Sequence, residues 1–198
     1  MQGAKGSPQA IGCAQEARVD CNSGGGSMRR VMIIGISSAG KSTFARALAS
    51  RTGLPVVHLD REFWQPGWVM SKREEFWPKV SAFAAAEQWI MDGNYGSSLH
   101  LRLPRADTVL WFDYPRLKCL RRAIWRSVSS YGRVRDDMAA GCPEQFDLEF
   151  ARYIWRFNDL ERHGVARALR EHGSHLMPVI FRKDGDVSAF LASLPQQQ

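Results

Sequence analysis

The fold is decided by one stretch near the start of the chain, which reads Val31-Met32-Ile33-Ile34-Gly35-Ile36-Ser37-Ser38-Ala39-Gly40-Lys41-Ser42-Thr43. Its first four residues are apolar, as in a buried strand, and the rest fits the pattern G-x-x-x-x-G-K-[ST]. Phe44, Ala47 and Leu48 follow at the spacing of one helix face. A strand that turns through glycines into a helix presents backbone N–H groups and the positive helix end to one anion. The stretch therefore predicts a phosphate-binding loop.

The same loop predicts the ligand. Lys41 can reach the terminal phosphates of a nucleoside triphosphate, and the Ser42 hydroxyl can ligate a magnesium ion that bridges them. Ser38 stands where many kinase loops have glycine, which narrows loop flexibility without removing a backbone donor. We expect ATP and Mg²⁺ as cofactors, bound by Gly35, Ser37, Ser38, Ala39, Gly40, Lys41, Ser42 and Thr43.

Composition limits the class of protein. A chain of 198 residues with 44% hydrophobic content is enough for one domain with a substantial core. No apolar stretch approaches the about 20 residues that cross a bilayer, so we expect a soluble, cytoplasmic protein with no membrane partner. The four cysteines lack metal-type spacing and are expected as reduced thiols, with Cys119 as a small packing residue. The net charge of +7 attracts anions, nucleotides and nucleic acids alike.

The first 27 residues differ from the rest. They are rich in Gly, Ser, Gln and Ala, and they end in a glycine run before Met28. We expect residues 1–27 to be a disordered leader or a non-native extension, with Met28 as the natural start. Residues 28–198 are expected to form the phosphate-binding domain.

Apolar runs alternate with helical patterns from Met28 onward. This alternation is typical of parallel strands joined by crossover helices, so the expected class is α/β, with three layers α/β/α. Each run is apolar on both faces, as in a sheet covered on two sides. The expected strands are 31–35, 56–60, 88–92, 108–113 and 177–182.

Four helices are expected between these strands. Gly53 ends the helix after the loop. The capping box Ser71-Lys72-Arg73-Glu74 starts a helix that runs to about Glu87, with Phe76, Val80 and Phe83 at core spacing. Further helices are expected from Arg116 to about Ser130 and from Asp147 to about Glu171. Residues 131–146, with two glycines, a proline and several charges, are expected to form a mobile lid.

Three expected strands end in an aspartate, namely Asp60, Asp92 and Asp113. Ligands of such sheets lie beyond the carboxyl ends of the strands. Phosphoryl transfer needs one carboxylate to organise magnesium and its waters, and often another to orient or deprotonate the acceptor hydroxyl. We assign Asp92 to the metal through water and Asp60 to the acceptor, with Asp113 ranked after them. The alternative for each is an aspartate that caps a strand end.

Aromatic residues and a glycine lie close to these aspartates. Trp64 and Trp68 either form a flat wall of the acceptor site or cover the core, and the sequence leaves both open. Gly93, directly after Asp92, allows the backbone to approach a ligand closely. His58 is expected to pack or to form a hydrogen bond within the sheet.

Arginines gather around the expected lid. Arg122 and Arg126 lie one helical turn apart on the helix that leads into it, and Arg133 and Arg135 lie within it. The planar guanidinium suits the charge that spreads over a transferring phosphoryl group. We expect at least one of them to contact phosphate and assign Arg126 a catalytic role.

The segments GISSAGKST, LPVVHLDREFWQPGW, WIMDGNY, RLPRADTVLWFDYPR and DMAAGCPEQFDLEF, in this order, resemble the DNA topology modulation (FlaR-like) family of adenylate-kinase-related P-loop proteins. The resemblance implies a nucleoside-kinase-type core of five parallel strands in the order 2-3-1-4-5, ATP with magnesium, and a lid between the last two strands. The chain is also distantly similar to adenylate kinase, whose Asp-Gly-Phe-Pro-Arg segment aligns with Asp92-Gly93-Asn94-Tyr95. No Pro-Arg follows here, so AMP is not the expected acceptor.

Two functions are carried forward. The first is an ATP-dependent kinase that transfers the γ-phosphoryl group to a small-molecule acceptor, with Lys41, Asp60, Asp92 and Arg126 as catalytic residues and Ser42 and Asp92 at the metal. The second is a nucleotide-binding regulator of DNA topology, in which the basic helix that begins at Arg116 meets the phosphate backbone. No DNA-binding motif supports the second.

Overall fold

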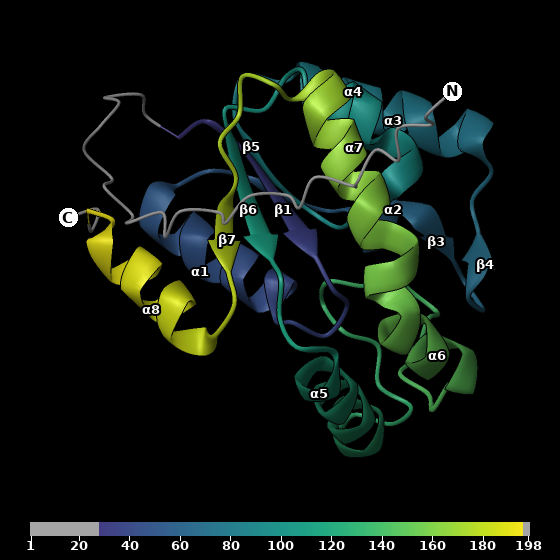
Figure 1. Ribbon diagram of the computed structural model, residues 1–198. Coiled ribbons are helices and arrows are strands. Elements are labelled where there is room, and N and C mark those ends of the chain that lie inside the picture. Colours follow the sequence, from purple (N-terminus) through teal and green to yellow (C-terminus); the bar gives the residue numbers. More distant parts are fainter. Residues whose placement is uncertain (1–27, 196–198) are drawn as a thin grey trace, which may run out of the picture.

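A parallel sheet of five strands forms the centre of the computed structural model, which describes residues 28–195 (Figure 1). The strands are β1 (Arg30–Gly35), β2 (Val56–His58), β5 (Trp89–Asp92), β6 (Thr108–Phe112) and β7 (Val179–Phe181). Their order is β2-β5-β1-β6-β7, and all four pairings are parallel. When only the strands of this sheet are counted along the chain, the order is 2-3-1-4-5, as expected. The expected leader, residues 1–27, lies outside the described residues.

Helices cover both faces of the sheet, which gives the expected three layers. Val31 and Ile33 of β1 face a core that includes residues of α1 (Lys41–Thr52) and α8 (Asp184–Ser193). Met32 and Ile34 face the opposite core, which includes residues of α3 (Arg73–Ala85), α4 (Leu99–Arg102) and α7 (His163–His172). Because alternate residues of β1 point into two cores, the strand is uncharged and buried at every position after Arg30.

The end of α1 and the extent of α5 agree with the sequence-based expectations, whereas the start of α3 departs from them. α1 ends at Gly53, which adopts a left-handed φ of 70°, and α5 (Arg116–Ser129) has the expected extent. The capping box is wrong: α3 begins at Arg73, and its first residue is preceded by Lys72, without a side-chain cap. The Ser71 amide instead donates a hydrogen bond to the carbonyl of Phe63, so Ser71 continues the preceding hairpin and does not cap α3.

The long helix expected from Asp147 to Glu171 is divided. It consists of α6 (Leu148–Phe157), the π-helical turn η2 (Asn158–Arg162) and α7. Asp147 caps α6, since its carboxylate accepts the Glu149 amide at 2.8 Å. A π turn carries an extra residue, and here it places Arg162 2.9 Å from Asp113 at the end of β6.

Several short elements have no counterpart in the sequence-based expectations. β3 (Trp64–Gln65) and β4 (Val69–Met70) form an antiparallel hairpin with Trp64 opposite Met70. The others are α2 (Leu59–Phe63), the 3-10 turn η1 (Gly96–Ser98), α4 and α8. Except for α8, which has ten residues, these elements have two to five residues and lack the repeated periodicity on which sequence interpretation depends.

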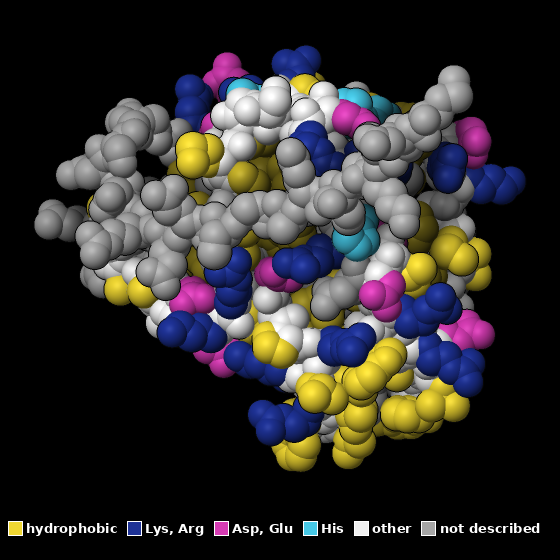
Figure 2. Space-filling model, viewed as in Figure 1, with side chains coloured by type: hydrophobic (Ala, Val, Ile, Leu, Met, Phe, Trp, Pro, Cys, Tyr) yellow, Lys and Arg dark blue, Asp and Glu magenta, His cyan; other side chains and the backbone are white. Residues whose placement is uncertain are grey.

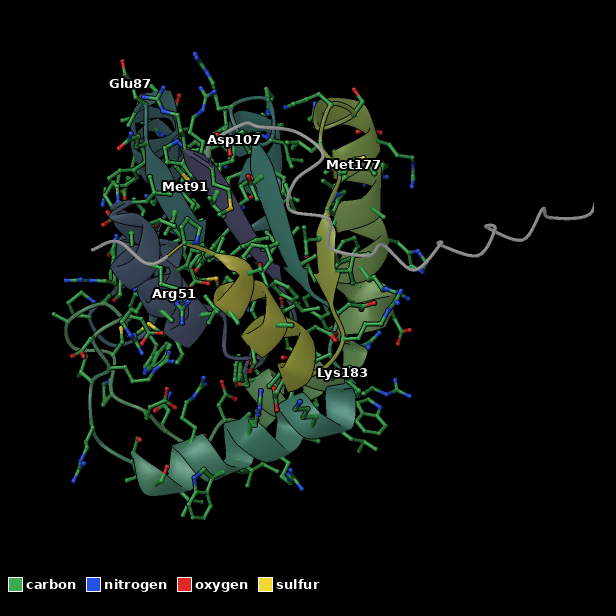
Figure 3. The ribbon with its side chains drawn as sticks, turned by 90° about the vertical axis from the view of Figure 1, so that its left-hand side faces the viewer. Arg51, Glu87, Met91, Asp107, Met177 and Lys183 are labelled. Carbon is green, nitrogen blue, oxygen red and sulfur yellow. The ribbon has the colours of Figure 1, made fainter. Side chains whose placement is uncertain are left out.

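The carboxyl ends of the strands, the phosphate-binding loop and α5 share one end of the molecule. In Figure 3, Glu87 and Asp107 mark the amino ends of β5 and β6 at the top, whereas Lys183, after β7, lies at the bottom near α5. Figure 2 shows apolar and basic side chains gathered over α5 and α6, whose exposed apolar residues include Leu117, Trp125, Val128 and Trp155. Among the helices of residues 28–195, none has both the length and the apolar character to cross a membrane.

Candidate active site

The phosphate-binding loop has the backbone conformation that its glycines permit. Gly35 adopts a φ of +130°, and a Cβ atom there would lie 2.2 Å from the carbonyl oxygen of Phe112. Gly40, with a φ of +97°, precedes α1 directly. Ser38 has a φ of 61°, a left-handed value that glycine adopts at lower cost. The loop therefore keeps a glycine-type conformation at Ser38 even without the glycine.

Lys41 begins α1 and turns back over this loop. Its Nζ donates to the carbonyl oxygens of Gly35 and Ile36, both at 3.0 Å. Burial lowers the pKa of Lys41, and the charges of Asp92 and Asp60 act in the opposite direction. A cation is thus held over the loop with two carboxylates within electrostatic reach.

Asp92 lies at the end of β5, where the sheet register places it beside His58 of β2 and Ile33 of β1. Its Oδ2 lies 3.1 Å from Nδ1 of His58, so His58 forms the expected hydrogen bond. Asp92 is only 5% exposed, and within residues 28–195 its Oδ1 has no hydrogen-bond partner. A buried carboxylate oxygen without a partner is costly, which points to a ligand such as a cation or its water.

Asp60 lies in the first turn of α2 rather than at the end of a strand. The Tyr95 hydroxyl donates to its Oδ1 at 2.6 Å. Burial raises the pKa of Asp60, although this hydrogen bond and the charges of Lys41 and Arg135 favour the ionised form. A carboxylate with a raised pKa accepts a proton more readily, as a general base requires.

The loop after β5 connects these groups. Gly93 has a φ of +139°, and Asn94 Oδ1 accepts the Gly35 amide at 2.7 Å, so the loop is joined to the phosphate-binding loop. Arg102 is fully buried and donates to the carbonyls of Gly93, Asn94 and Tyr95. Burial lowers the pKa of Arg102 to about 9. Sequence interpretation missed Arg102, since nothing around it distinguishes it from a surface arginine.

The lid supplies a residue that sequence interpretation also missed. Asp137 is buried, with 5% of its surface exposed. Arg135 Nη1 lies 3.2 Å from Asp137 Oδ2. Burial acts to raise the pKa of Asp137, but Arg135 and the Ser42 hydroxyl outweigh it and hold the pKa below its ordinary value. The lid therefore contains a buried carboxylate that is paired with Arg135 of the same segment.

A second lid carboxylate holds two arginines together. Glu144, 5% exposed, places Oε1 3.1 Å from Arg126 Nε and 2.7 Å from Arg135 Nε. Burial and the neighbouring Arg135 lower the pKa of Arg126, while Glu144 opposes them. Arg126 is also close enough to lower the pKa of Lys41. The expected catalytic arginine thus lies near the loop, paired with the lid.

The lid rests on the β3–β4 hairpin. Trp64 and Trp68 pack against a small buried cluster of Met138, Ala139 and Cys142. Trp68 Nε1 donates to the carbonyl of Pro143 at 3.0 Å. Of the two interpretations of the tryptophans, neither describes this arrangement fully, because their contacts lie with the lid. Cys119 and Cys142 are free, buried thiols, and Cys119 lies in the core as expected.

Two other expected residues lie at the margin. Arg122 Nη1 donates to the carbonyl of Ala39 in the phosphate-binding loop at 3.1 Å. Its Nη2 lies 2.9 and 3.0 Å from the two carboxylate oxygens of Asp184. Hydrogen bonds from Lys118 and Arg122 lower the pKa of Asp184 to about 2. Asp113 is paired with Arg162 of η2, away from the group formed by Asp60 and Asp92.

The donor set fits magnesium better than a metal held by protein alone. In the part of the chain that the structure describes, no three His, Cys, Asp or Glu side chains converge on a common point. Ser42 and Asp92 are available instead, and Mg²⁺ is commonly held by one or two carboxylates together with substrate phosphates and water.

Comparison with known proteins gives similarity of fold only. Neither a protein-family model nor a curated protein matches the chain, so membership of the FlaR-like family stays a prediction. Among solved structures, the chain is similar to shikimate kinase from Aquifex aeolicus vf5 (16% identity, 83% of this chain and 94% of that one, TM-score 0.47). It is also similar to a gluconokinase from Sinorhizobium meliloti 1021 (14%, 83% and 91%, 0.44) and to shikimate kinase from Acinetobacter baumannii in complex with shikimate (16%, 84% and 90%, 0.49). The chain folds as an α/β protein with a five-stranded parallel sheet between layers of helices.

Proposed function

We propose that this protein is an ATP-dependent kinase that transfers the γ-phosphoryl group of ATP to a hydroxyl- or phosphate-bearing small molecule. The observation that carries the proposal is the meeting of three parts at one end of the sheet. These are a phosphate-binding loop with Lys41 over it, the buried carboxylates Asp60 and Asp92, and a lid that contributes arginines.

The transfer needs little covalent chemistry from the protein. The acceptor oxygen forms a bond to the γ-phosphorus, the bond from that phosphorus to the β,γ-bridging oxygen breaks, and ADP leaves with the electron pair. When the acceptor is a hydroxyl, Asp60 takes its proton. The raised pKa of Asp60 and its hydrogen bond from Tyr95 suit this role, since Tyr95 orients the carboxylate and leaves the second oxygen for the acceptor.

Charge stabilisation falls to Lys41, Arg126 and Arg135. Negative charge spreads over the equatorial oxygens of the transferred group, and preorganised cations nearby lower the barrier. Arg126 and Arg135 share Glu144, which holds both guanidinium groups beside the loop. Mg²⁺ held by Ser42 and Asp92 would neutralise phosphate charge. An ATP-dependent enzyme with two free, buried thiols is suited to the cytoplasm.

The test is a screen for ADP release with Mg²⁺·ATP against nucleosides, nucleotides, sugars and aminoglycoside-like acceptors. Wild-type protein should release ADP with at least one class, and Lys41→Ala should lower turnover by about 10³-fold or more while the fold is retained. Arg46→Ala, at an exposed position of the same helix, is the matched control. Equal ADP release by the Lys41→Ala and wild-type proteins would overturn the proposal.

The structure gives less support to the rival function, a regulator of DNA topology. Of the five basic residues of α5, Lys118 and Arg122 pair with Asp184, Arg126 pairs with Glu144, and Arg116 stacks on Trp155 at 4.3 Å. The exposed face of the helix is largely apolar, with Leu117, Trp125 and Val128 more than 60% exposed. A DNA mobility shift that weakens steeply with salt would favour the rival, and no shift at low ionic strength would remove it.

A further inference from the structure

We propose that Arg102 is a positioning residue of the acceptor site, because it holds residues 93–95 in the place from which the Tyr95 hydroxyl fixes the Asp60 carboxylate. The inference deepens the proposed function, on which it rests for the role of Asp60 as the base. Arg102 donates to backbone carbonyls, so it acts on the reaction only through the segment that it holds.

The first support is the way in which the guanidinium of Arg102 is used. Its Nη1 donates to the carbonyl of Gly93 at 3.0 Å, and its Nη2 donates to the carbonyls of Asn94 and, at 3.4 Å, Tyr95. The side chain is fully buried, and in the described part of the chain it forms no ion pair with a carboxylate. A buried charge without an opposite charge is costly. An apolar side chain would fill the core at lower cost, so the arginine is explained by the carbonyls that it holds.

The second support is the strained backbone of the segment. Tyr95 has a φ of 38°, a left-handed value that is unusual for a bulky residue. Such a conformation persists only where the surrounding contacts impose it, and it is concentrated at functional sites. The Tyr95 carbonyl accepts the Ser98 amide at 2.8 Å and the Ser98 hydroxyl at 3.0 Å, in addition to Arg102.

The side chains of this segment contact both halves of the site. The Tyr95 hydroxyl donates to Asp60 Oδ1 at 2.6 Å, and Asn94 Oδ1 accepts the Gly35 amide at 2.7 Å. One side chain therefore fixes the proposed base, and its neighbour joins the segment to the phosphate-binding loop. Because transfer depends on the placement of the acceptor relative to the phosphate, a small shift of the segment would slow it.

The connection from the sheet to Arg102 is anchored at both ends. The Gly93 amide donates to the carbonyl of Ile33 in β1 at 3.1 Å. Leu99, at the start of α4, and Leu103, directly after α4, are buried in the core beside the sheet. Arg102 thus spans a loop between two fixed points.

The rival explanation is that Arg102 only stabilises the fold. In that case its loss lowers activity to the same degree whether or not the Tyr95 hydroxyl is present. If Arg102 positions Asp60 through Tyr95, its loss has little further effect once that hydroxyl is gone. Arg102→Lys is the informative substitution, since it keeps the charge but replaces the planar fork by a single nitrogen.

The first measurement needs no turnover. The chain has four tyrosines, so tyrosine labelled with carbon-13 at Cζ gives few nuclear magnetic resonance signals, and Tyr95→Phe assigns that of Tyr95. We expect Arg102→Lys to move this signal toward the position of an exposed tyrosine, because the hydrogen bond to Asp60 is weakened. Arg51→Lys should leave it in place. Arg51 is the matched control because its Nη1 also donates to a backbone carbonyl, that of Leu191, at 2.5 Å.

The second measurement is a double-mutant cycle in kcat with the acceptor found in the screen, with thermal melting as a check of folding. We expect Tyr95→Phe and Arg102→Lys each to lower kcat about tenfold or more. The double variant should be no more than about threefold slower than Tyr95→Phe. The Kd of Mg²⁺·ATP should stay within about threefold of wild type in Arg102→Lys, because Lys41 is held by local contacts.

Equal losses from Arg102→Lys with and without the Tyr95 hydroxyl would overturn the inference, as would a Tyr95 signal that does not move. Arg102→Gln takes the place of Arg102→Lys if that variant fails to fold, and an unchanged kcat in Tyr95→Phe would overturn the inference by itself. A wild-type protein that never releases ADP, with a Tyr95 signal that depends on Arg102, would refute the kinase proposal alone. Normal turnover and an unmoved Tyr95 signal in Arg102→Lys would refute the inference alone.

Discussion

The phosphate-binding loop and the lid are held by contacts of very different range. Lys41 contacts carbonyls five and six positions before it. The lid contacts partners 75 and 77 positions away, through Trp68 with Pro143 and Cys142 with Gln65. Local contacts leave a pattern in the sequence, whereas distant contacts do not. The loop was therefore predicted residue by residue, and the lid only as a segment.

The largest expected effect falls on Asp60, which interacts electrostatically with both Lys41 of the loop and Arg135 of the lid. Asp60→Asn removes the proposed base, so turnover with a hydroxyl acceptor should fall about 10²- to 10⁴-fold. The amide oxygen can still accept the Tyr95 hydroxyl, so the fold should remain. Steady-state kinetics with the acceptor found in the screen check this, and a loss under about threefold would remove Asp60 from the mechanism.

The same substitution has a pH signature in stability. Burial raises the pKa of Asp60 above its ordinary value of 3.8. The stabilising contribution of such a carboxyl is complete below the unfolded pKa and is lost as the pH rises through the folded one. The difference in Tm, Asp60→Asn minus wild type, should therefore grow as the pH rises above about 4. A difference that shrinks over this range would contradict the assigned direction.

Gly35→Ala would disrupt the phosphate-binding loop, which is held by local contacts. A Cβ at this position meets the Phe112 carbonyl at 2.2 Å, and the φ of +130° is one that alanine rarely adopts. We expect a loss of about 3–4 kcal/mol, with Tm lower by roughly 6–16 °C. Gly132→Ala, with a φ of +73° and nothing near the added atom, is the control that carries backbone strain alone. Equal melting of the two variants would mean that close approach at Gly35 is unimportant.

Glu144→Gln would disrupt the lid, which is held by contacts between residues far apart in the sequence. It leaves Arg126 and Arg135 beside each other without the shared carboxylate. Because both arginines are about a quarter exposed, we expect a loss of about 1–3 kcal/mol, below that of a fully buried pair. Trypsin should then cut at Arg133 or Arg135 faster. Glu149→Gln, exposed on α6, should change neither stability nor cleavage, and identical cleavage of both variants would argue against Glu144 as the anchor.

Ser38→Gly gives the smallest effect. It relieves the left-handed φ of 61° and removes a buried hydroxyl that has no hydrogen-bond partner in the described chain. We expect a gain of up to about 1 kcal/mol, or about 2–4 °C in Tm, with ATP affinity unchanged. A melting scan decides it, and a lower Tm would show that the side chain has a stabilising role.

The difference between local and distant contacts also explains which parts of the fold could be predicted from the sequence. The two-sided core follows from runs of apolar residues, as in β1, whereas the strand order was expected only from the family resemblance. The capping box predicted at Ser71 was wrong, because the Ser71 amide donates a hydrogen bond to the carbonyl of Phe63, beside the β3–β4 hairpin. The rule that strand ends carry ligands stays a prediction for Asp92, whose buried Oδ1 has no partner in the described chain. Asp113, which meets the same rule, pairs with Arg162 of a π turn. Asp137, Glu144 and Arg102 depend on burial that no short pattern reports.

The central claim is that the loop from Gly35 to Thr43 binds a nucleoside triphosphate, and calorimetric titration of the full chain with ATP or GTP in the presence of Mg²⁺ tests it most directly. We predict saturable binding at one site for wild type and its loss in Lys41→Ala. An absence of saturable binding by wild-type protein with both nucleotides would contradict the account.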